Sequence, residues 1–153
     1  MRPFFDAILS ELENLHAAVE KTLDGLPPEA LDWAPAAGAN SLGALAVHVA
    51  GSERYWIGEV SGQEPASRDR EAEFQSRGLA AAALQRRLSD TLAHSRTVLA
   101  RLSEADLALK RLTTPQGREY NTAGALLHSL AHTAEHKGHM EFTRQLWDQR
   151  RAS

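Results

Sequence analysis

The chain has 153 residues, of which 42% are hydrophobic and 24% are charged, an ordinary composition for a globular protein. Its length predicts one domain spanning residues 1–153. The formal net charge is −3, from 17 basic and 20 acidic residues, and such a balance does not favour a nucleic-acid partner. Cysteine is absent, which excludes disulfides, thiolate zinc sites and a cysteine nucleophile.

The N-terminal segment, MRPFFDAILSELENL, has acidic residues from position 6 onward and no long apolar run. It therefore resembles neither a signal peptide nor a membrane span. We expect a cytoplasmic protein without a membrane partner.

Apolar residues recur at spacings of three and four over residues 3–23, which predicts a first amphipathic helix. The segment GLPPEALDWAPAAGAN follows, and its three prolines and two glycines predict a loop with a short turn at residues 29–33. A second helix should begin at Asn40 or Ser41, both favourable N-cap residues, and continue to about residue 60.

The polar and charged segment SGQEPASRDREAEFQSRG follows and is long enough to cross one end of a helical bundle. A third helix is expected over residues 79–102. Pro115, Gln116 and Gly117 then form a turn signal, and a last helix should start at Asn121 or Thr122 and run to about residue 149. No segment is typical of a strand, so four amphipathic helices predict an all-α four-helix bundle.

The segment HSLAHTAEHKGH contains four of the seven histidines of the chain. Since each helical residue turns by about 100°, all four imidazoles share one face of the last helix. Apolar residues adjoin this face, so we expect it to point inward or along a cleft. The four residues are His128, His132, His136 and His139.

One metal ion cannot bind all four side chains, but an i, i+4 pair lies within reach of a single ion. Both His128/His132 and His132/His136 are candidate pairs. His48, beside the apolar seam of the second helix, is the natural third ligand. Three neutral imidazoles with an open coordination position are typical of a catalytic metal site.

Three further polar residues interrupt apolar patterns. His16 is interpreted as a packed core histidine, and His94 falls at the edge of the apolar arc of its helix. Glu53 projects into the apolar seam of the second helix and needs a partner there. That partner is either the N–H of a metal-binding imidazole or an arginine, and the sequence leaves both alternatives open.

The segments SLGALAVHVAGSERYWIG and LLHSLAHTAEHKGHMEFTRQLW resemble the DinB/YfiT-like superfamily, whose members are regarded as metalloenzymes. The sequences GHME and HVAGSERYW are most similar to the branch related to mycothiol-dependent maleylpyruvate isomerase. In that branch the middle ligand is typically glutamate, where this chain has His132. Many superfamily members have glutamine at the position of His139.

The resemblance implies a four-helix bundle of unusual connectivity, with a long connection between the second and third helices, and often a homodimer. It also implies a divalent metal ion, with zinc or nickel favoured, bound by His48, His132 and His136. Gly138 closes the motif. His128 then becomes a pocket or supporting residue, with His139, Glu53, Ser52 and Tyr55 as further candidates around the site.

Some superfamily members transfer low-molecular-weight thiols, and this activity is the first hypothesis: the metal holds the thiol as a thiolate, which attacks an electrophile. The alternative is a hydrolase using metal-activated water with the same ligands. A third hypothesis is a non-catalytic metal-binding stress-response module. A polar pocket beside the metal, to which Ser52, Tyr55 and Glu59 could contribute, would favour an enzyme.

Overall fold

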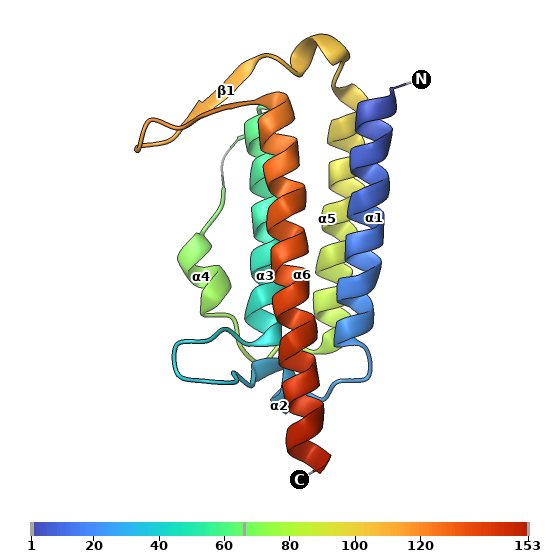
Figure 1. Ribbon diagram of the computed structural model, residues 1–153, viewed down its shortest axis with the longest axis vertical. Coiled ribbons are helices and arrows are strands. Elements are labelled where there is room, and N and C mark those ends of the chain that lie inside the picture. Colours follow the sequence, from blue (N-terminus) through green and yellow to red (C-terminus); the bar gives the residue numbers. More distant parts are fainter. Residues whose placement is uncertain (1, 66, 153) are drawn as a thin grey trace.

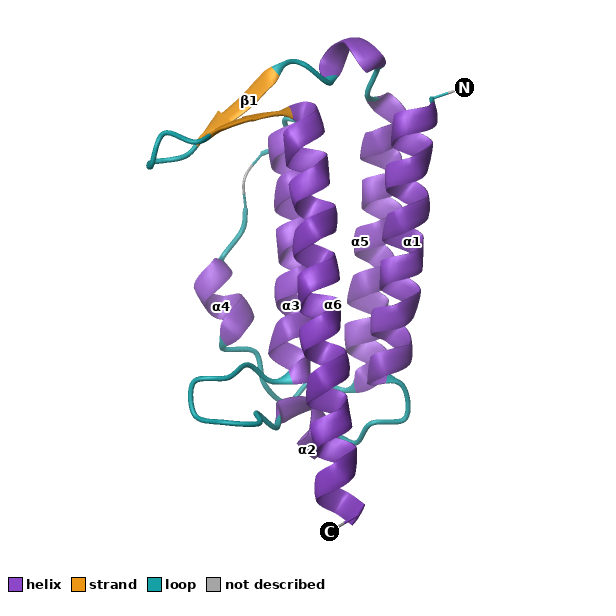
Figure 2. Cartoon of the chain, in the orientation of Figure 1, coloured by secondary structure: helices purple, strands orange, loops and turns teal. Residues whose placement is uncertain are grey.

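The structure, a computed structural model, describes residues 2–65 and 67–152 and is built mainly from helices (Figures 1 and 2). Four long helices form a bundle, which confirms the predicted fold class. They are α1 (Pro3–Leu23), α3 (Leu42–Glu53) with its π-helical continuation η1 (Arg54–Ser61), α5 (Ala81–Arg101) and α6 (Thr122–Ala152). Among the described residues, no helix is both long enough and apolar enough to span a membrane.

Short elements occupy the connections between the long helices. A five-residue helix, α2 (Pro28–Asp32), lies in the first connection, close to the predicted turn. Helix α4 (Arg70–Phe74) lies in the second connection, and a 3₁₀ turn, η2 (Glu104–Asp106), follows α5.

The connectivity differs from a simple up-and-down bundle. Helices α3 and α5 run in the same direction, so the connection between them returns along the bundle (Figure 1). This confirms the predicted long connection. Helix α1 packs against α5 and α6, and α3 packs against the same two helices on the other side. The return of the chain therefore leaves α3 beside α6, although more than sixty residues separate them.

The helix boundaries follow from local capping. The Ser41 hydroxyl accepts a hydrogen bond from the Ala44 N–H at 3.2 Å and begins α3. The Asn121 side chain accepts from the Gly124 N–H at 2.8 Å and begins α6. Both residues were candidate caps, because a side-chain oxygen satisfies an amide that has no partner in the first helical turn.

The expectation that no segment forms a strand is wrong. Strands β1 (Lys110–Thr113) and β2 (Glu119–Asn121) pair antiparallel, with an irregular register after Lys110. The predicted turn at residues 115–117 is their hairpin loop, and Gly117 has φ +81°, which favours glycine. Each strand has only three or four residues, so neither shows enough alternation to be recognised from sequence.

Helix α3 lies at the centre of the bundle, since every residue from Leu42 to Ala50 is buried. Glu53, at its end, is also fully buried and interacts with neither of its expected partners. Its carboxylate bonds to His16 Nε2 on α1 at 2.6 Å and accepts from the Ser95 hydroxyl on α5 at 2.6 Å. These bonds satisfy the buried carboxylate and link three helices. The prediction for Glu53 is therefore corrected, whereas His16 is a core histidine as expected.

Candidate metal centre

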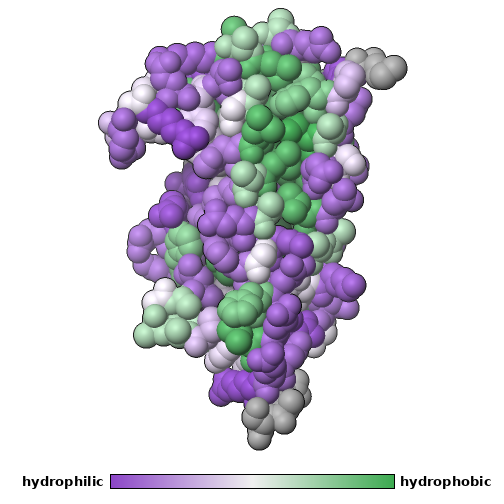
Figure 3. Space-filling view, viewed as in Figure 1, coloured by the Kyte–Doolittle hydropathy of each residue, from purple (hydrophilic) through white to green (hydrophobic). Residues whose placement is uncertain are grey.

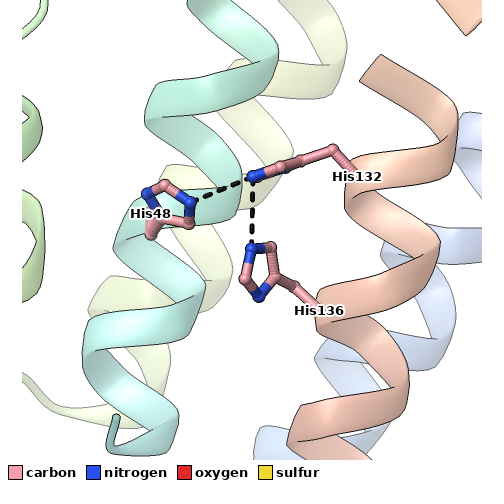
Figure 4. Close-up of side chains that lie close together, drawn as sticks. All are labelled: His48, His132 and His136. Carbon is pink, nitrogen blue, oxygen red and sulfur yellow. Dashed lines mark hydrogen bonds between the residues drawn. The ribbon is translucent and has the colours of Figure 1, made fainter. Parts of the chain in front are cut away.

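Three imidazoles meet where α3 faces α6, and Figure 4 shows His48 projecting from one helix toward His132 and His136 on the other. His48 Nε2 lies 3.0 Å from His132 Nε2, and His136 Nε2 lies 3.2 Å from the same atom. Each residue offers a nitrogen within 4.8 Å of the others. The three residues can therefore present three nitrogen donors to a single ion.

The positions of the three side chains follow from the two helices. His132 and His136 are four residues apart on α6, so their side chains lie one above the other on the same face. His48 comes from the buried helix α3, whose backbone cannot shift without disturbing the core. Two of the three nitrogens are thus set by helix periodicity, and the third is set by the packing of α3 against α6.

A carboxylate fixes the orientation of the His48 ring. Glu73, from α4, accepts a hydrogen bond from His48 Nδ1 at 2.8 Å. Arg68 holds the same carboxylate by two bonds, from Nε at 2.7 Å and from a terminal nitrogen at 2.8 Å. Because Nδ1 carries the donated proton, the lone pair of His48 is on Nε2, the atom that faces His132 and His136.

Local packing allows Glu73 this close approach. A Cβ atom at Gly51 would lie 2.0 Å from Glu73 Oε1 and 2.6 Å from its carboxyl carbon, so any larger residue would displace the Glu73 carboxylate from this position. The Phe74 ring, next to Glu73, packs on the His48 ring at a centroid distance of 4.3 Å. Helix α4 therefore restrains both the tautomer and the ring plane of His48.

Burial keeps the three imidazoles neutral. It lowers the pKa of His132 to about 3 and that of His136 to about 4, with smaller contributions from the neighbouring histidines. Burial also lowers the pKa of His48, and the hydrogen bond that His48 donates to Glu73 only partly offsets this effect. Burial alone would raise the pKa of Glu73, but its bonds from Arg68 and His48 outweigh it and keep the carboxyl ionised. Neutral imidazole is the form that binds metals.

The other two histidines of the α6 stripe flank this cluster. His128 is half-buried, with its ring 4.2 Å from that of Trp56, 5.5 Å from Tyr120 and 6.2 Å from His132. His139 is exposed, and its ring lies 5.5 Å from that of His136. Of the two candidate pairs, His132/His136 is the one that faces His48.

The remaining candidates lie along α3 and η1. Ser52 is buried one turn beyond His48, and Tyr55 is half-buried with the Arg68 guanidinium 5.6 Å from its ring centroid. Glu59 accepts from the backbone N–H of Ser67 at 3.0 Å, which ties the long connection to η1. Tyr55 is therefore the candidate that contacts a residue supporting the site.

His94 lies outside the cluster, as expected. Its Nε2 bonds to Glu64 at 2.6 Å, and Arg101 bonds to the other oxygen of that carboxylate at 2.6 Å. These three residues form a separate ion-pair group on α5 and the long connection. His94 is therefore suited as a control for the cluster.

Sequence reasoning missed the residues of the long connection that support His48. Arg68, Glu73 and Phe74 lie in a polar segment that resembles an ordinary solvated loop. The local signal is an Asp69 N-cap, whose side chain accepts from Ala72 N–H at 3.0 Å. A cap predicts a short helix, but it does not indicate that Glu73, and not Glu71, faces α3.

A family model described as mycothiol S-transferase matches residues 7–149. The chain belongs to the mycothiol S-transferase family. The match includes most or all of each long helix and the three clustered histidines. A search of curated proteins found no match.

Solved structures resemble this family member over nearly its whole length. A conserved protein from Enterococcus faecalis matches with a TM-score of 0.76 and 16% identity, covering 95% of this chain and 97% of its own. A DinB-like protein from Bacillus cereus ATCC 10987 matches with a TM-score of 0.73 and 18% identity, covering 92% of this chain and 90% of its own. A candidate member of the DinB family from Exiguobacterium sibiricum 255-15 matches with a TM-score of 0.72 and 21% identity, covering 97% of this chain and 94% of its own. At these identities the matches establish a DinB-like fold.

The lowered pKa values of His132 and His136 predict how the stability of the metal-free protein depends on pH. In the unfolded chain these two histidines take up protons near their ordinary pKa of 6.5. In the folded chain they do so only at about pH 4 and below. The free energy of unfolding should therefore fall as the pH falls from 6.5 toward 4. We expect urea denaturation at about pH 7.5 and pH 5 to show a smaller loss of unfolding free energy for His136→Asn than for the wild type. The variant lacks one of the two histidines that take up a proton only on unfolding. An identical loss in the variant would contradict this explanation.

Proposed function

We propose that His48, His132 and His136 bind a divalent metal ion and that the protein uses it to transfer a low-molecular-weight thiol to an electrophile. The convergence of three neutral Nε2 atoms at the α3–α6 contact is the observation that supports the proposal most directly. Membership of the mycothiol S-transferase family supports the thiol as the cosubstrate.

The spacing of the nitrogens suits a metal of the size of zinc or nickel. Zinc–nitrogen bonds of about 2.0–2.1 Å in tetrahedral geometry place ligand nitrogens about 3.3–3.4 Å apart. The observed separations of 3.0 and 3.2 Å around His132 need to open by only a few tenths of an ångström. The hydrogen bond between His48 Nδ1 and Glu73 is the contact that a metal-binding imidazole typically makes through its second nitrogen.

The transfer requires a deprotonated sulfur, and the protein itself has no cysteine. A bound divalent metal would act as a Lewis acid that lowers the pKa of the thiol and keeps the thiolate populated near neutral pH. The sulfur then forms a bond to an electrophilic carbon of the acceptor. If the acceptor has a leaving group, that group departs with the bonding electron pair, and if it has an activated double bond, the adjacent carbon takes up a proton.

The protein's own residues supply orientation in this reaction. His48 is held by Glu73, and Arg68 holds Glu73 in turn, so the third nitrogen does not have to be ordered when reactants bind. His128, Trp56 and Tyr120 form an aromatic wall on one side of His132. Such a wall excludes water from one side of the reacting sulfur, which favours transfer over hydrolysis.

We also propose that the protein is a homodimer formed through the outward face of α6. Leu127 is 53% exposed and Phe142 is 61% exposed, and the small residues Ala131, Ala134 and Gly138 lie between them on that face. Figure 3 shows hydrophobic surface over α6 and the adjoining part of α1. A Cβ at Gly138 would contact nothing within 4 Å, so no close approach by the rest of the described chain explains a glycine in this helix.

The large and small residues of this face are arranged symmetrically along α6. Leu127 and Phe142 are equally distant from the midpoint between positions 134 and 135, and so are Ala131 and Gly138. A two-fold axis at this midpoint would pair large residues at the ends of a stripe about 22 Å long and small residues near its centre. Small residues at the crossing allow two helices to approach closely, which supports a second copy as the partner.

The assignment of the ligands predicts the effect of removing each one. His48→Ala, His132→Ala and His136→Ala should each lose bound metal, measured by elemental analysis after gel filtration, because two imidazoles bind an ion weakly. Glu73→Ala should weaken metal binding by about 10–100-fold, since the His48 ring is no longer oriented. His94→Ala is the matched control and should retain the metal. A stoichiometric metal content in His48→Ala would disprove the ligand set.

Cobalt substitution separates thiol transfer from hydrolysis. A thiol that ligates through sulfur should add charge-transfer absorption to the spectrum of the cobalt-loaded protein, and no cysteine of the chain can contribute to this signal. At a hundred times its dissociation constant, the thiol should also stabilise the fold by about 2.7 kcal/mol. Mycothiol, bacillithiol and glutathione are added separately, followed by an electrophile and detection of the S-conjugate. Spectral silence with all three thiols, together with thiol-independent turnover of an ester, would replace the proposal with a hydrolase.

The dimer proposal predicts that a charge on the α6 stripe separates the subunits. Phe142→Glu should convert the protein to a monomer in sedimentation equilibrium, because the partner would bury an unpaired carboxylate. Leu109→Glu is a matched control, since Leu109 is 47% exposed but lies outside α6. A wild-type protein that sediments as a monomer at all concentrations would overturn this interface.

A further inference from the structure

Two arginines flank the histidine cluster from different elements of the chain. Arg70 begins α4, and Arg118 precedes β2. Helix α4 and the hairpin lie on the same side of the bundle, and the surface is indented between them (Figures 1 and 3). Both arginines are exposed, so their guanidinium groups are accessible to a molecule in solution.

Each guanidinium is held over an aromatic ring that itself packs on a histidine of the α6–α3 contact. The Arg70 guanidinium lies 5.0 Å from the Phe74 ring centroid, and Phe74 packs on His48. The Arg118 guanidinium lies 4.7 Å from the Tyr120 ring centroid, and Tyr120 contacts His128. Stacking of this kind orders an exposed arginine but leaves its N–H donors free.

Neither Arg70 nor Arg118 forms an ion pair with an acidic side chain among the described residues. Arg68, which lies closer to His48, is engaged in a two-point ion pair with Glu73. Next to Arg118, Glu119 pairs with Lys110. The exposed Glu135 on α6 is the remaining carboxylate that acts on the cluster, where it raises the pKa of His136 against the larger effect of burial.

Arg70 acts electrostatically on two histidines of the cluster, and Arg118 acts on His128 beside it. Burial is the main cause of the lowered pKa values of His48, His136 and His128, and Arg70 adds to the effect on the first two. Arg118 adds to the effect on His128. The positive charge of Arg70 therefore reaches imidazoles of both α3 and α6.

We propose that Arg70 and Arg118 recognise a carboxylate or another anionic group on one of the two reactants, while the reacting atom of that molecule lies at the histidine cluster. The inference rests on the proposed thiol transfer and specifies the chemical class of a reactant. Two ordered guanidinium groups on either side of a site suit planar anions, which they bind by paired hydrogen bonds. The anion belongs either to the thiol or to the acceptor.

The first arm of the test concerns the thiol. Mercaptosuccinate and the neutral 2-mercaptoethanol are titrated into the cobalt-loaded protein, and binding is read from charge-transfer absorption. If the thiol is the anionic reactant, mercaptosuccinate should bind roughly tenfold tighter, as expected for charge-assisted hydrogen bonds, and added salt should reduce this preference. Arg70→Gln and Arg118→Gln should each reduce it several-fold. Arg96→Gln, which removes an exposed arginine that pairs with Glu13 between α5 and α1, should not.

The second arm concerns the acceptor. With 2-mercaptoethanol as the thiol, 4-chloro-3-nitrobenzoate is compared with the neutral 1-chloro-2,4-dinitrobenzene, and the KM for each aryl chloride is measured. A thiolate displaces chloride in both cases. If the acceptor is the anionic reactant, Arg70→Gln and Arg118→Gln should raise the KM of the benzoate and leave that of the neutral chloride unchanged.

The outcomes distinguish this inference from the proposed function. If sulfur absorption appears but neither arm shows a preference that the two arginine variants reduce, the inference is wrong and thiol binding stands. If no thiol perturbs the cobalt spectrum, the proposed function is wrong. The anion site is then decided by comparing succinate with succinamide on the d–d bands of cobalt, where an arginine-dependent preference for succinate supports it and equal binding refutes it.

Discussion

The candidate site depends on the close packing of α3 against α6. His48 lies on a helix whose residues from Leu42 to Ala50 are all buried, so its backbone position is set by the core. His132 and His136 lie on the facing helix, and the 3.0 Å separation between His48 and His132 exists only because the two helices are in contact. A small change in this packing would move one nitrogen out of reach of the other two.

The long connection explains why α3 lies beside α6 and how the His48 ring is held in place. Because α3 and α5 run in the same direction, the chain must return along the bundle before α5 begins. Helix α4 lies on this return, and it places Glu73 and Phe74 against His48. Gly51 allows the approach, since a side chain there would overlap the Glu73 carboxylate. The long connection thus determines both the position of α3, which holds His48, and the contacts that restrain the His48 ring.

Buried polar groups have two distinct roles in this bundle. His16 and Ser95 pair with the two carboxylate oxygens of Glu53 inside the core and link α1, α3 and α5. Glu73 and Arg68 instead satisfy one side of His48 and leave its Nε2 directed at the α6 histidines. The first group lies inside the core and brings no third ligand together with His16 and Glu53, whereas the second group is bonded to one of three convergent imidazoles. This difference separates a structural carboxylate from one that supports a site.

The sequence alone determined the helices, their caps and the stripe of histidines, because helical periodicity and capping depend on residues only a few positions apart. It also singled out His48, which lies beside the apolar seam of the second helix. Tertiary structure decided the rest. Glu53 pairs with His16 and not with an imidazole of the site, and Glu73 pairs with His48. Neither pair could be predicted from local patterns, because each joins segments that are distant in sequence.

The hairpin was also missed by sequence analysis, because its strands are too short to show a period. They become stable only through cross-strand pairing and the packing of Tyr120 on Trp56. Local patterns name the candidate ligands, but only packing determines which polar groups face one another.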